Sequence, residues 1–428
     1  MKAIILAGGL GSRMGEPGRT TPKPLMEIHG KPILLYQLEA LKKEGITDFV
    51  FVTCHLSEQI EAYFKDGKEF GVSITYYRET SPLGTAGALF RLGLTEDFLL
   101  CNGDLIFDID LTSMTDFHQK NNALATLFVH PNNHPSDSVT LDTNESSQVV
   151  RVNPKNNKAT FYQNLCNAGI QIISPELLSM YSYRGKADFD TDIISPAIGT
   201  GRIFAYPSAE YVHDAGTPER FSKVSADIAS GIVSAKNKRN TQKAVFVDRD
   251  GTLNVHKGYI TSPEDIELIS GVTEAINTFH RLGYLVIMIT NQPVIARGDC
   301  TSEDLKNIHC RLELLLAEGK AYLDGIYYCP HHPDRGFEGE KEELKISCSC
   351  RKPSPGLILQ AQKDFNIDLS VSYMIGDSNA DVKAGINAGC IPVFIGSTGK
   401  VSCEAFNSLK DFSEYLSSLH KITESSLD

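Results

Sequence analysis

Short apolar runs alternate with longer amphipathic stretches along most of the chain. The stretches Pro32–Lys43 and Ser302–Ala317 carry apolar residues at helical spacing, whereas the runs between such stretches are continuous and flanked by glycine. Buried strands that alternate with helices are typical of an α/β fold with a mainly parallel sheet. The runs that we expect to form strands are Ala3–Leu6, Phe49–Val52, Phe98–Cys101, Ala244–Val247, Val286–Ile289 and Tyr373–Ile375.

This pattern begins twice, each time with an apolar run that ends in a glycine-containing turn. Between the two starts lie a helix-like stretch, Thr217–Ser234, and the polar segment AKNKRNTQ, where a domain boundary is expected. The sequence therefore predicts two doubly wound α/β domains. Their predicted bounds are residues 1–235 and 243–400, joined by the linker 236–242 and followed by a short helix and polar tail at 401–428.

The composition limits the class of partner. A net charge of −12 without long runs of Lys or Arg argues against nucleic acid or an anionic membrane, so any phosphate site must be local. The apolar N-terminal run is too short for a signal peptide, and no stretch approaches the roughly 18 apolar residues of a membrane helix. Ten cysteines, four of them close together, indicate a metal site in a reducing compartment. We expect a cytoplasmic protein with small-molecule substrates, and the sequence leaves open whether it forms a homo-oligomer.

A glycine-rich turn with two nearby cations follows the first apolar run. It reads LAGGLGSR at residues 6–13, and glycines there allow backbone N–H groups to approach phosphate oxygens. Arg13 closes the turn, and Lys23 follows between two prolines in TPKPL. The turn could be purely structural and Lys23 could be a solvated surface residue. Together, however, the glycine turn, Arg13 and Lys23 suit the binding of a triphosphate.

Two acids of the first half are candidate magnesium ligands. Asp104 follows the run Phe98–Cys101 directly, and sites of open α/β sheets lie at the carboxyl ends of strands. Asp214 precedes Gly-Thr-Pro, where it could instead cap a helix, and Asp108 and Asp110 are interpreted as loop or cap residues.

Six motifs in order, LAGGxGSR, TPKPL, GTAGAL, NGD, NAGI and DAGTPERF, resemble the sugar-phosphate nucleotidylyltransferases over residues 1 to about 235. The resemblance implies a Rossmann-like domain in which Lys23 contacts the α-phosphate, Asp104 and Asp214 hold Mg²⁺, and Asn167 faces the sugar. It implies that the nucleotide contacts are Leu6, Gly8, Gly9, Gly11, Arg13, Lys23, Glu79 and Gly84.

The stretch Glu79–Gly84 lies where such enzymes approach the base. The Glu79 carboxylate can accept two donors from guanine but only one from uracil or thymine, which favours GTP. The sequence departs from many relatives at Arg151–Lys155, which replaces a Glu-Lys-Pro motif, so Lys155 or Lys158 are candidate substitutes at the sugar.

The second half begins with VFVDRDGTL, which places Asp248 and Asp250 in a tight turn after a buried strand. This motif, TNQ, Lys352 and GDSNAD resemble haloacid-dehalogenase-type phosphatases. In that family the first Asp attacks phosphorus and the second acts as acid and base, with Mg²⁺ between facing carboxylates. The resemblance implies that Thr290 and Asn291 bind the phosphoryl group and Lys352 neutralises it. The implied Mg²⁺ ligands are Asp248, Asp250 and Asp377, whereas Asp381 is expected to contact these ligands and not the metal itself.

A cysteine cluster fits tetrahedral zinc. Cys329 and His331 form one pair, and Cys348 and Cys350 form another, separated by a polar loop. His332 is the competing ligand, and a disulfide is the alternative. Four protein ligands indicate a structural zinc, which would hold the loop that ends at Arg351-Lys352.

The motifs DRDGTLN, TNQPVIARG, CPHHP, CxCRKP and GDS are together similar to heptose 1,7-bisphosphate 7-phosphatases over residues 243–397, and histidinol-phosphate phosphatases share much of this pattern. Ser378 stands where relatives sometimes carry Lys. The implied substrate contacts are His256, Lys257, Gly258, Tyr259, Asn291, Gln292, Arg351 and Lys352.

The two resemblances meet in one sugar phosphate. Removing the 7-phosphate yields a heptose 1-phosphate, the substrate class of the first domain, so we expect consecutive steps toward GDP-heptose. Two alternatives stay open: both chemistries act on another sugar or with another nucleoside triphosphate, or the first domain is a regulatory module that only binds a sugar nucleotide.

Overall fold

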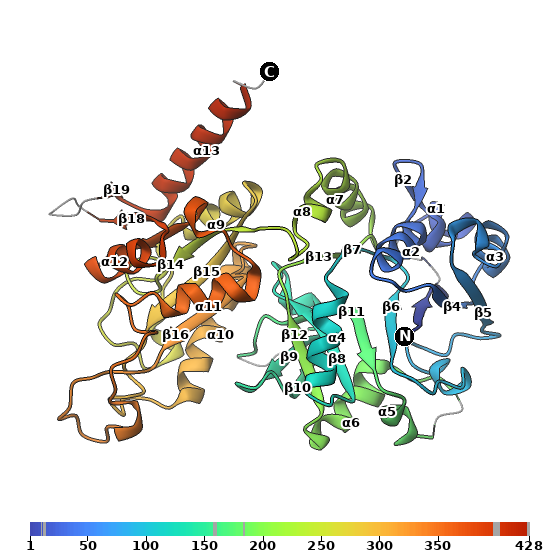
Figure 1. Ribbon diagram of the computed structural model, residues 1–428, viewed down its shortest axis with the longest axis horizontal. Helices are drawn as coiled ribbons and strands as arrows, with labels where there is room; N and C mark the ends of the chain where they lie inside the picture. Colours follow the sequence, from blue (N-terminus) through green and yellow to red (C-terminus); the bar gives the residue numbers. More distant parts are fainter. Residues whose placement is uncertain (10, 12–13, 157–160, 183–184, 397–402, 426–428) are drawn as a thin grey trace. The chain divides into compact units, whose positions relative to one another are not determined.

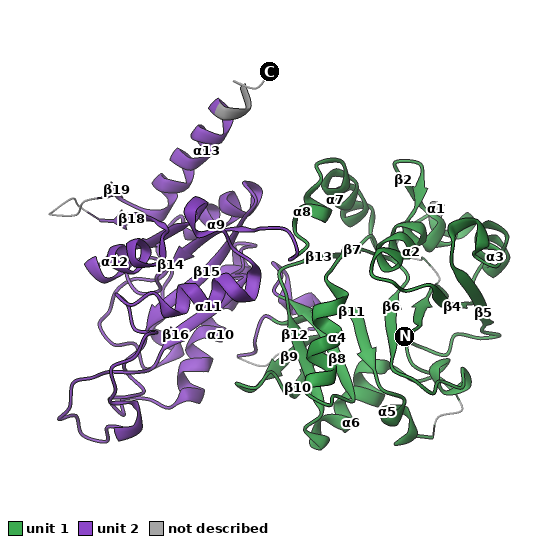
Figure 2. Cartoon of the chain, viewed as in Figure 1, with its two compact units in different colours: residues 1–130, 139–155, 165–237 green, residues 131–138, 156–164, 238–428 purple. Residues whose placement is uncertain are grey.

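The computed structural model describes residues 1–9, 11, 14–156, 161–182, 185–396 and 403–425 (Figure 1). They form two compact units (Figure 2). Unit 1 comprises residues 1–130, 139–155 and 165–237, and unit 2 comprises 131–138, 156–164 and 238–428. Two short segments from the first half of the sequence therefore group with the second unit. One of them ends at Asn164, whose backbone N–H donates to Glu313 Oε2 at 3.3 Å.

Unit 1 is built on a sheet that has nine strands in the described ranges. The central strand, β1, is flanked by β4 and β6, and both pairings are parallel. The sheet order is β10-β9-β11-β6-β1-β4-β5, with β8 beside β11 and β12 beside β8. The bounds are β1 Ala3–Leu6, β4 Asp48–Thr53, β5 Ser73–Arg78, β6 Phe98–Asn102, β8 Ala125–His130, β9 Thr140–Thr143, β10 Val149–Asn153, β11 Cys166–Ile173 and β12 Ile203–Pro207.

The strand β11 corrects the expectation of a mainly parallel sheet in unit 1. It runs antiparallel to β6, β8 and β9, so the sheet is mixed. Its apolar residues are buried in the same way as those of the parallel strands. A continuous apolar run predicts burial on both faces, but it carries no information on strand direction.

Helices and two short strand pairs complete unit 1. The pair β7 and β13 is antiparallel and places Asp214 opposite Leu105. Its bounds are β7 Leu105–Asp108 and β13 Tyr211–Asp214, and the other pair is β2 Glu27–Ile28 with β3 Lys31–Pro32. The helices are α1 Pro17–Thr20, α2 Ile33–Lys43, α3 Ser57–Phe64, α4 Leu111–Lys120, α5 Pro175–Ser179, α6 Ser195–Ala197, α7 Pro218–Ala229 and α8 Ile232–Ala235.

Unit 2 has a parallel sheet, as predicted, with six strands among the described residues in the order β16-β15-β14-β17-β18-β19. The strands are β14 Lys243–Val247, β15 Tyr284–Asn291, β16 Gly325–Cys329, β17 Tyr373–Gly376, β18 Ile391–Ile395 and β19 Glu404–Phe406. The helices are α9 Val272–Arg281, α10 Ser302–Glu318, α11 Gly356–Phe365, α12 Asn379–Ala388 and α13 Leu409–Ser425.

The C-terminal helix α13 is longer than the expected short helix, with 17 residues. Leu409, Phe412 and Leu416 are buried in the core of unit 2, and the Phe412 ring lies 5.9 Å from the Phe279 ring of α9. Spacings of three and four residues place these side chains on one helical face, so packing extends the helix beyond what its polar sequence indicates. Within the described part of the chain, no helix is both long and apolar enough to cross a membrane.

Candidate active sites

The glycine turn of unit 1 follows β1 at the carboxyl end of three parallel strands. Leu6 ends β1 between Val52 and Asn102 of the neighbouring strands. A Cβ on Gly8 would lie 3.1 Å from the Cys54 Cβ, so this backbone approaches β4 closely. Gly9 faces open space, Gly11 adopts a left-handed φ of +63°, and Arg13 lies outside the described residues.

Lys23 is buried rather than solvated, which excludes the alternative of a surface lysine. Its Nζ lies 2.5 Å from Asp104 Oδ2, and only 8% of the residue is exposed. An ion pair across 81 residues of sequence brings the cation of the TPKPL motif to the end of β6. The fold therefore holds the positive charge of Lys23 next to the negative charge of Asp104.

Asp104 and Asp214 lie beside each other through the strand pair β7 and β13. The N–H of Ala215 donates to the Asp104 carbonyl oxygen at 2.9 Å. The Asp214 carboxylate accepts from Arg220 Nη1 at 2.8 Å, whereas Thr217 caps helix α7, so Asp214 is not the helix cap. The two carboxylates could share a divalent cation, because oxygen ligands are what Mg²⁺ prefers.

Glu79 follows β5 and has one unsatisfied oxygen. The residue is 8% exposed, and its Oε1 has no hydrogen-bond partner within the part of the chain that the structure describes. Burial raises the pKa of Glu79, although the N–H of Leu83 and the charge of Arg91 oppose this shift. Gly84 ends the same loop with a φ of +78°, where a Cβ would meet the Ala187 oxygen at 2.3 Å. An unpaired buried carboxylate oxygen costs free energy that a ligand donor would recover.

Asn167 of β11 contacts an acid that the sequence analysis did not select. Its Nδ2 donates to Asp190 Oδ1 at 2.8 Å. Burial raises the pKa of Asp190 to about 6, the charge of Asp188 adds to this, and Lys155 acts in the opposite direction. The charge of Lys155 therefore acts on this acid, whereas Lys158 lies outside the described residues.

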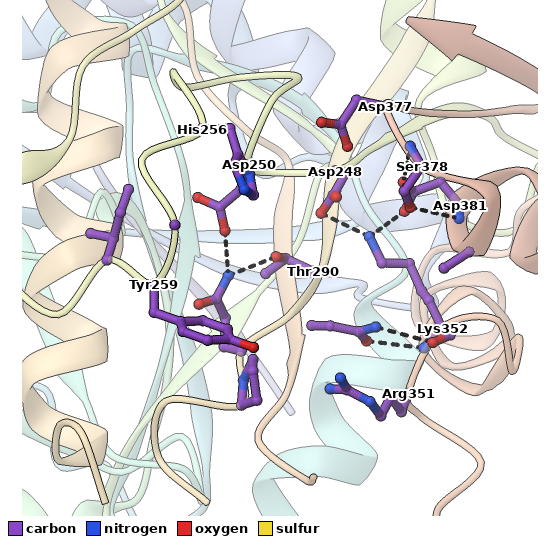
Figure 3. Close-up of a pocket in the computed structure, with 16 residues that line it drawn as sticks. Asp248, Asp250, His256, Tyr259, Thr290, Arg351, Lys352, Asp377, Ser378 and Asp381 are labelled. Atoms are coloured by element: carbon purple, nitrogen blue, oxygen red, sulfur yellow. Dashed lines mark hydrogen bonds and ion pairs between the residues drawn. The ribbon is translucent and has the colours of Figure 1, made fainter. Parts of the chain in front are cut away.

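In unit 2, a cavity of about 410 Å³ gathers most of the predicted phosphatase residues (Figure 3). Lys257 does not line it and instead pairs with Glu267 at 2.9 Å. The cavity is lined by Asp248, Asp250, His256, Gly258, Tyr259, Ile260, Thr290, Asn291, Gln292, Pro293, Arg351, Lys352, Asp377, Ser378, Ala380 and Asp381.

Lys352 is the central cation of this cavity. Its Nζ lies 2.7 Å from Asp248 Oδ1 and 2.6 Å from Asp381 Oδ1, and it donates to the Ile289 oxygen at 2.8 Å. Burial alone would lower the pKa of Lys352, but the two facing carboxylates raise it. Asn291 holds the Lys352 backbone from both sides, at 3.0 and 3.1 Å, so its amide is engaged with the chain itself.

Three carboxylates form a candidate metal site next to Lys352. Oxygens of Asp248, Asp377 and Asp381 lie within 4.8 Å of one another. Burial raises the pKa of Asp248 to about 7 and also raises that of Asp377, so a cation would stabilise their charged forms. Gly251 allows the close approach, because a Cβ there would lie 1.9 Å from Asp377 Oδ2.

The Asp250 side chain lies outside this cluster, unlike the predicted magnesium set. It accepts from Arg249 Nε at 3.1 Å and Nη2 at 2.9 Å, from Gln292 at 3.0 Å and from Asn254 at 3.1 Å. Burial alone would raise the pKa of Asp250, but Arg249, Gln292 and Asn254 lower it. The Asp250 carboxylate is thus held by four hydrogen bonds from Arg249, Gln292 and Asn254, apart from the carboxylate cluster of Asp248, Asp377 and Asp381.

The four predicted zinc ligands converge at the end of β16. Ligand atoms of Cys329, His331, Cys348 and Cys350 lie within 4.8 Å of one another, with Sγ–Sγ distances of 3.2 to 3.6 Å. All ten cysteines of the chain carry free thiols. His332 does not join the cluster and has its Nδ1 3.4 Å from the Asp334 carbonyl oxygen. Three sulfurs and one nitrogen fit a tetrahedral metal site.

The chain continues from the Cys/His cluster directly into the cavity. Arg351 follows Cys350 and donates from Nη1 to the His331 oxygen at 3.1 Å. The next residue, Lys352, reaches the carboxylates. The loop that ends the cluster therefore also supplies two cations of the cavity.

Comparison with known proteins separates the two halves. Residues 2–231 match the nucleotidyl transferase family, and residues 349–414 match a HAD-hydrolase-like family. Over 186 residues the chain is 40% identical to the D-glycero-beta-D-manno-heptose-1,7-bisphosphate 7-phosphatase of Photorhabdus laumondii, which covers 42% of this chain and 97% of that protein. The chain therefore belongs to two families, nucleotidyl transferases and HAD-like phosphatases.

Solved structures match each half separately. HddC from Yersinia pseudotuberculosis in complex with GMP-PN is 24% identical, with a TM-score of 0.46, and covers 53% of this chain and 99% of that one. The D,D-heptose 1,7-bisphosphate phosphatase of B. bronchiseptica in complex with magnesium and phosphate is 28% identical, with a TM-score of 0.36, and covers 41% and 98%.

Sequence reasoning missed two groups in this nucleotidyl transferase and phosphatase. Arg249 and Asn254 donate hydrogen bonds to Asp250. Both lie in the motif DRDGTLN, so their closeness to Asp250 in the sequence could have indicated this contact. Asp190 lies in DFDTD, where three acids alternate, and that run was the signal for it.

Proposed function

We propose that the chain carries out two consecutive reactions on one sugar. The phosphatase unit removes the 7-phosphate from D-glycero-D-manno-heptose 1,7-bisphosphate. The nucleotidyl transferase unit then transfers GMP from GTP to the heptose 1-phosphate and releases pyrophosphate. The observation that carries the proposal is the 40% identity over 97% of a heptose bisphosphate 7-phosphatase, combined with a transferase domain on the same chain.

In the phosphatase unit, Asp248 attacks phosphorus and the bond to the sugar oxygen breaks. Asp250 gives its proton to the leaving oxygen and later takes one from the water that hydrolyses the aspartyl-phosphate. Lys352 holds Asp248 in position and offsets phosphoryl charge. Magnesium held by Asp248 and Asp377 would neutralise the carboxylates and the phosphoryl oxygens.

In the nucleotidyl transferase unit, an oxygen of the sugar 1-phosphate attacks the α-phosphorus in line, and pyrophosphate leaves. Lys23 is fixed beside Asp104 and offsets charge at the α-phosphate. Asp104 and Asp214 are the residues that would hold magnesium. Positioning and charge neutralisation supply most of the rate enhancement in such a reaction.

The buried Glu79 oxygen supports guanine as the base. Guanine presents two N–H donors, N1 and N2, along one edge, and a carboxylate can accept both. Uracil and thymine present one donor there and would leave a carboxylate oxygen unpaired. Glu79 Oε1 lacks a partner among the described residues, so one donor of the base can bind it, and guanine offers a second donor to the same carboxylate.

The cysteine cluster is proposed to bind zinc in a structural role. Three thiolates and one imidazole complete a tetrahedral site without an open position. Free thiols at all ten cysteines suit a reducing, cytoplasmic compartment.

The decisive experiment supplies each anomer of heptose 1,7-bisphosphate with GTP and Mg²⁺ and identifies the products by mass spectrometry. GDP-heptose, phosphate and pyrophosphate are expected, and without GTP the reaction should stop at heptose 1-phosphate. Asp248→Asn should block all three products from the bisphosphate but leave heptose 1-phosphate a substrate, whereas Lys23→Ala should stop the reaction at heptose 1-phosphate. Faster turnover of histidinol phosphate, or better transfer from UTP, would overturn the assignment.

A further inference from the structure

An arginine that the proposed reaction does not use contacts two aromatic rings, of which one, Tyr259, lines the phosphatase cavity. The Arg297 Cζ lies 4.3 Å from the centroid of the Tyr259 ring and 4.2 Å from that of Phe337. Its Nε also donates to Asp299 Oδ2 at 2.7 Å. A planar guanidinium stacks on aromatic faces, so Arg297 connects two segments that are far apart in the sequence.

Tyr259 belongs to an exposed loop that lines the cavity. The four residues 256–259 are all exposed, and the Tyr259 residue is 54% exposed. The next residue, Ile260, is buried and anchors the end of the loop. Figure 3 shows Tyr259 on the opposite side of the cavity from Asp377 and Asp381. A loop with so little buried surface opens easily unless another contact holds it.

Phe337 belongs to an arm, residues 331–345, that starts at the metal cluster and is firmly built. The Lys345 Nζ lies 4.3 Å from the Phe337 ring, donates to the Asp334 oxygen at 2.9 Å, and pairs with Glu340 at 3.2 Å. Glu340 in turn accepts from the Phe337 N–H at 3.0 Å. The Lys345 side chain has no exposed surface, so the Phe337 ring packs against a buried residue.

The arm is also fastened to the loop that carries Arg297. The N–H of Lys341 donates to the Ala296 oxygen at 3.0 Å. Gly298 and Gly339 pack so closely that a Cβ on Gly298 would lie 2.1 Å from the Gly339 oxygen. Arg297 and Phe337 are therefore fixed relative to each other, and Tyr259 is the exposed partner that they hold.

We propose that Arg297 is a positioning residue of the phosphatase site, which holds Tyr259 against the arm 331–345 and so shapes the part of the cavity that receives the sugar. The assignment rests on the proposed function for the identity of that sugar. It does not rest on it for the contact itself. Tyr259 makes no bond to Asp248 or Asp250 in Figure 3 and lies opposite Asp377 and Asp381, so we place the consequence on substrate binding rather than on the chemical step.

The contact can be measured without substrate, because the chain has no tryptophan. Tyr259→Trp places one fluorophore in the stack, and acrylamide quenching reports how far it is exposed. Adding Arg297→Ala should raise the quenching constant by at most about twofold, because residue 259 is already 54% exposed when the contact is intact. Arg297→Lys keeps the charge and should restore part of the protection, whereas Arg335→Ala, an exposed arginine of the same arm, should change nothing.

Kinetics on the otherwise native chain complete the test. Arg297→Ala should raise KM for the sugar bisphosphate by roughly two- to fivefold at unchanged kcat, and leave turnover of p-nitrophenyl phosphate unaltered. Phe337→Leu should reproduce the effect if Arg297→Ala folds poorly. The assignment would be overturned if neither Arg297→Ala nor Phe337→Leu changed the quenching of Tyr259→Trp. It would also be overturned if the phosphatase rate fell equally with p-nitrophenyl phosphate and with the sugar bisphosphate. If the native chain does not hydrolyse the heptose bisphosphate, but Arg297→Ala still raises the quenching of Tyr259→Trp, only the proposed function would be overturned.

Discussion

Replacing Arg249 by Met tests whether the buried cation holds the acid-base residue Asp250. The Arg249 side chain has no exposed surface and donates twice to the Asp250 carboxylate, at 2.9 and 3.1 Å. Methionine fills similar space without charge, so the substitution leaves the carboxylate without its cation. Removing one partner of a buried pair costs about 3–5 kcal/mol.

The expected loss lies at the lower end of that range. Gln292 and Asn254 still donate to Asp250, and 18% of the Asp250 side chain is exposed to water. We therefore expect a loss of about 3 kcal/mol in the free energy of unfolding of unit 2. At about 2–4 °C per kcal/mol for a unit of this size, its melting temperature should fall by roughly 6–12 °C.

Calorimetry and a double-mutant cycle provide the assay. Arg249→Met, Asp250→Asn and the double variant are compared with Arg335→Met, an exposed arginine of the same unit. The double variant should lose less stability than the sum of the single losses, because it leaves no unpaired charge. Phosphatase turnover of Arg249→Met should also fall, but by less than the roughly 10²–10⁴-fold that loss of a general acid-base costs, which Asp250→Asn measures.

Two results would refute this reasoning. A melting temperature of Arg249→Met within about 2 °C of the parent, less than 1 kcal/mol at this size, would show that the pair contributes little. Strictly additive losses in the cycle would show that the two residues act independently of each other.

Three further predictions follow from single sites. His309 is buried and its pKa is lowered to about 3 by burial and by Arg249, so the folded state keeps it neutral while the unfolded state binds a proton below its ordinary pKa of about 6.5. Stability should therefore fall by about 2 kcal/mol more between pH 7 and 5 in the parent than in His309→Asn, measured by urea unfolding at each pH. Verified removal of the cluster metal should lower the melting temperature of unit 2 and its phosphatase rate, and unchanged values would exclude a structural metal. Glu79→Gln should reduce the preference for GTP over UTP by roughly tenfold, measured as kcat/KM, and an unchanged ratio would place the base elsewhere.

The sequence indicated where the candidate site residues lie in the fold better than it indicated which residues surround them. Asp248, Thr290 and Asp377 stand at or just beyond the ends of buried strands, and short apolar runs followed by acids made those ends visible. The ends of neighbouring parallel strands meet at one edge, so their convergence follows from the pattern. Arg249 and Asp190 were not predicted, because an ion pair such as Arg249–Asp250 and a hydrogen bond such as Asn167–Asp190 depend on side-chain direction, which periodicity does not encode.

The direction of β11 and the length of α13 were not predicted from the sequence, for a related reason. Both depend on packing between segments distant in sequence, such as Ile170 beside Cys101 and Phe412 beside Phe279. Local propensity describes each segment alone, whereas tertiary contacts decide how an apolar run is used.

Buried cations beside the candidate site acids offer a physical reason why a chain with a net charge of −12 would bind the phosphate substrates proposed for it. Lys23 pairs with Asp104, Arg249 with Asp250, and Lys352 with Asp248, and all three cations are buried. A cation in low dielectric acts strongly on a nearby phosphoryl group, while surface charges are screened within about 10 Å. The overall charge therefore disfavours large anionic partners, whereas we expect these few buried pairs to act on a small phosphate ligand next to them.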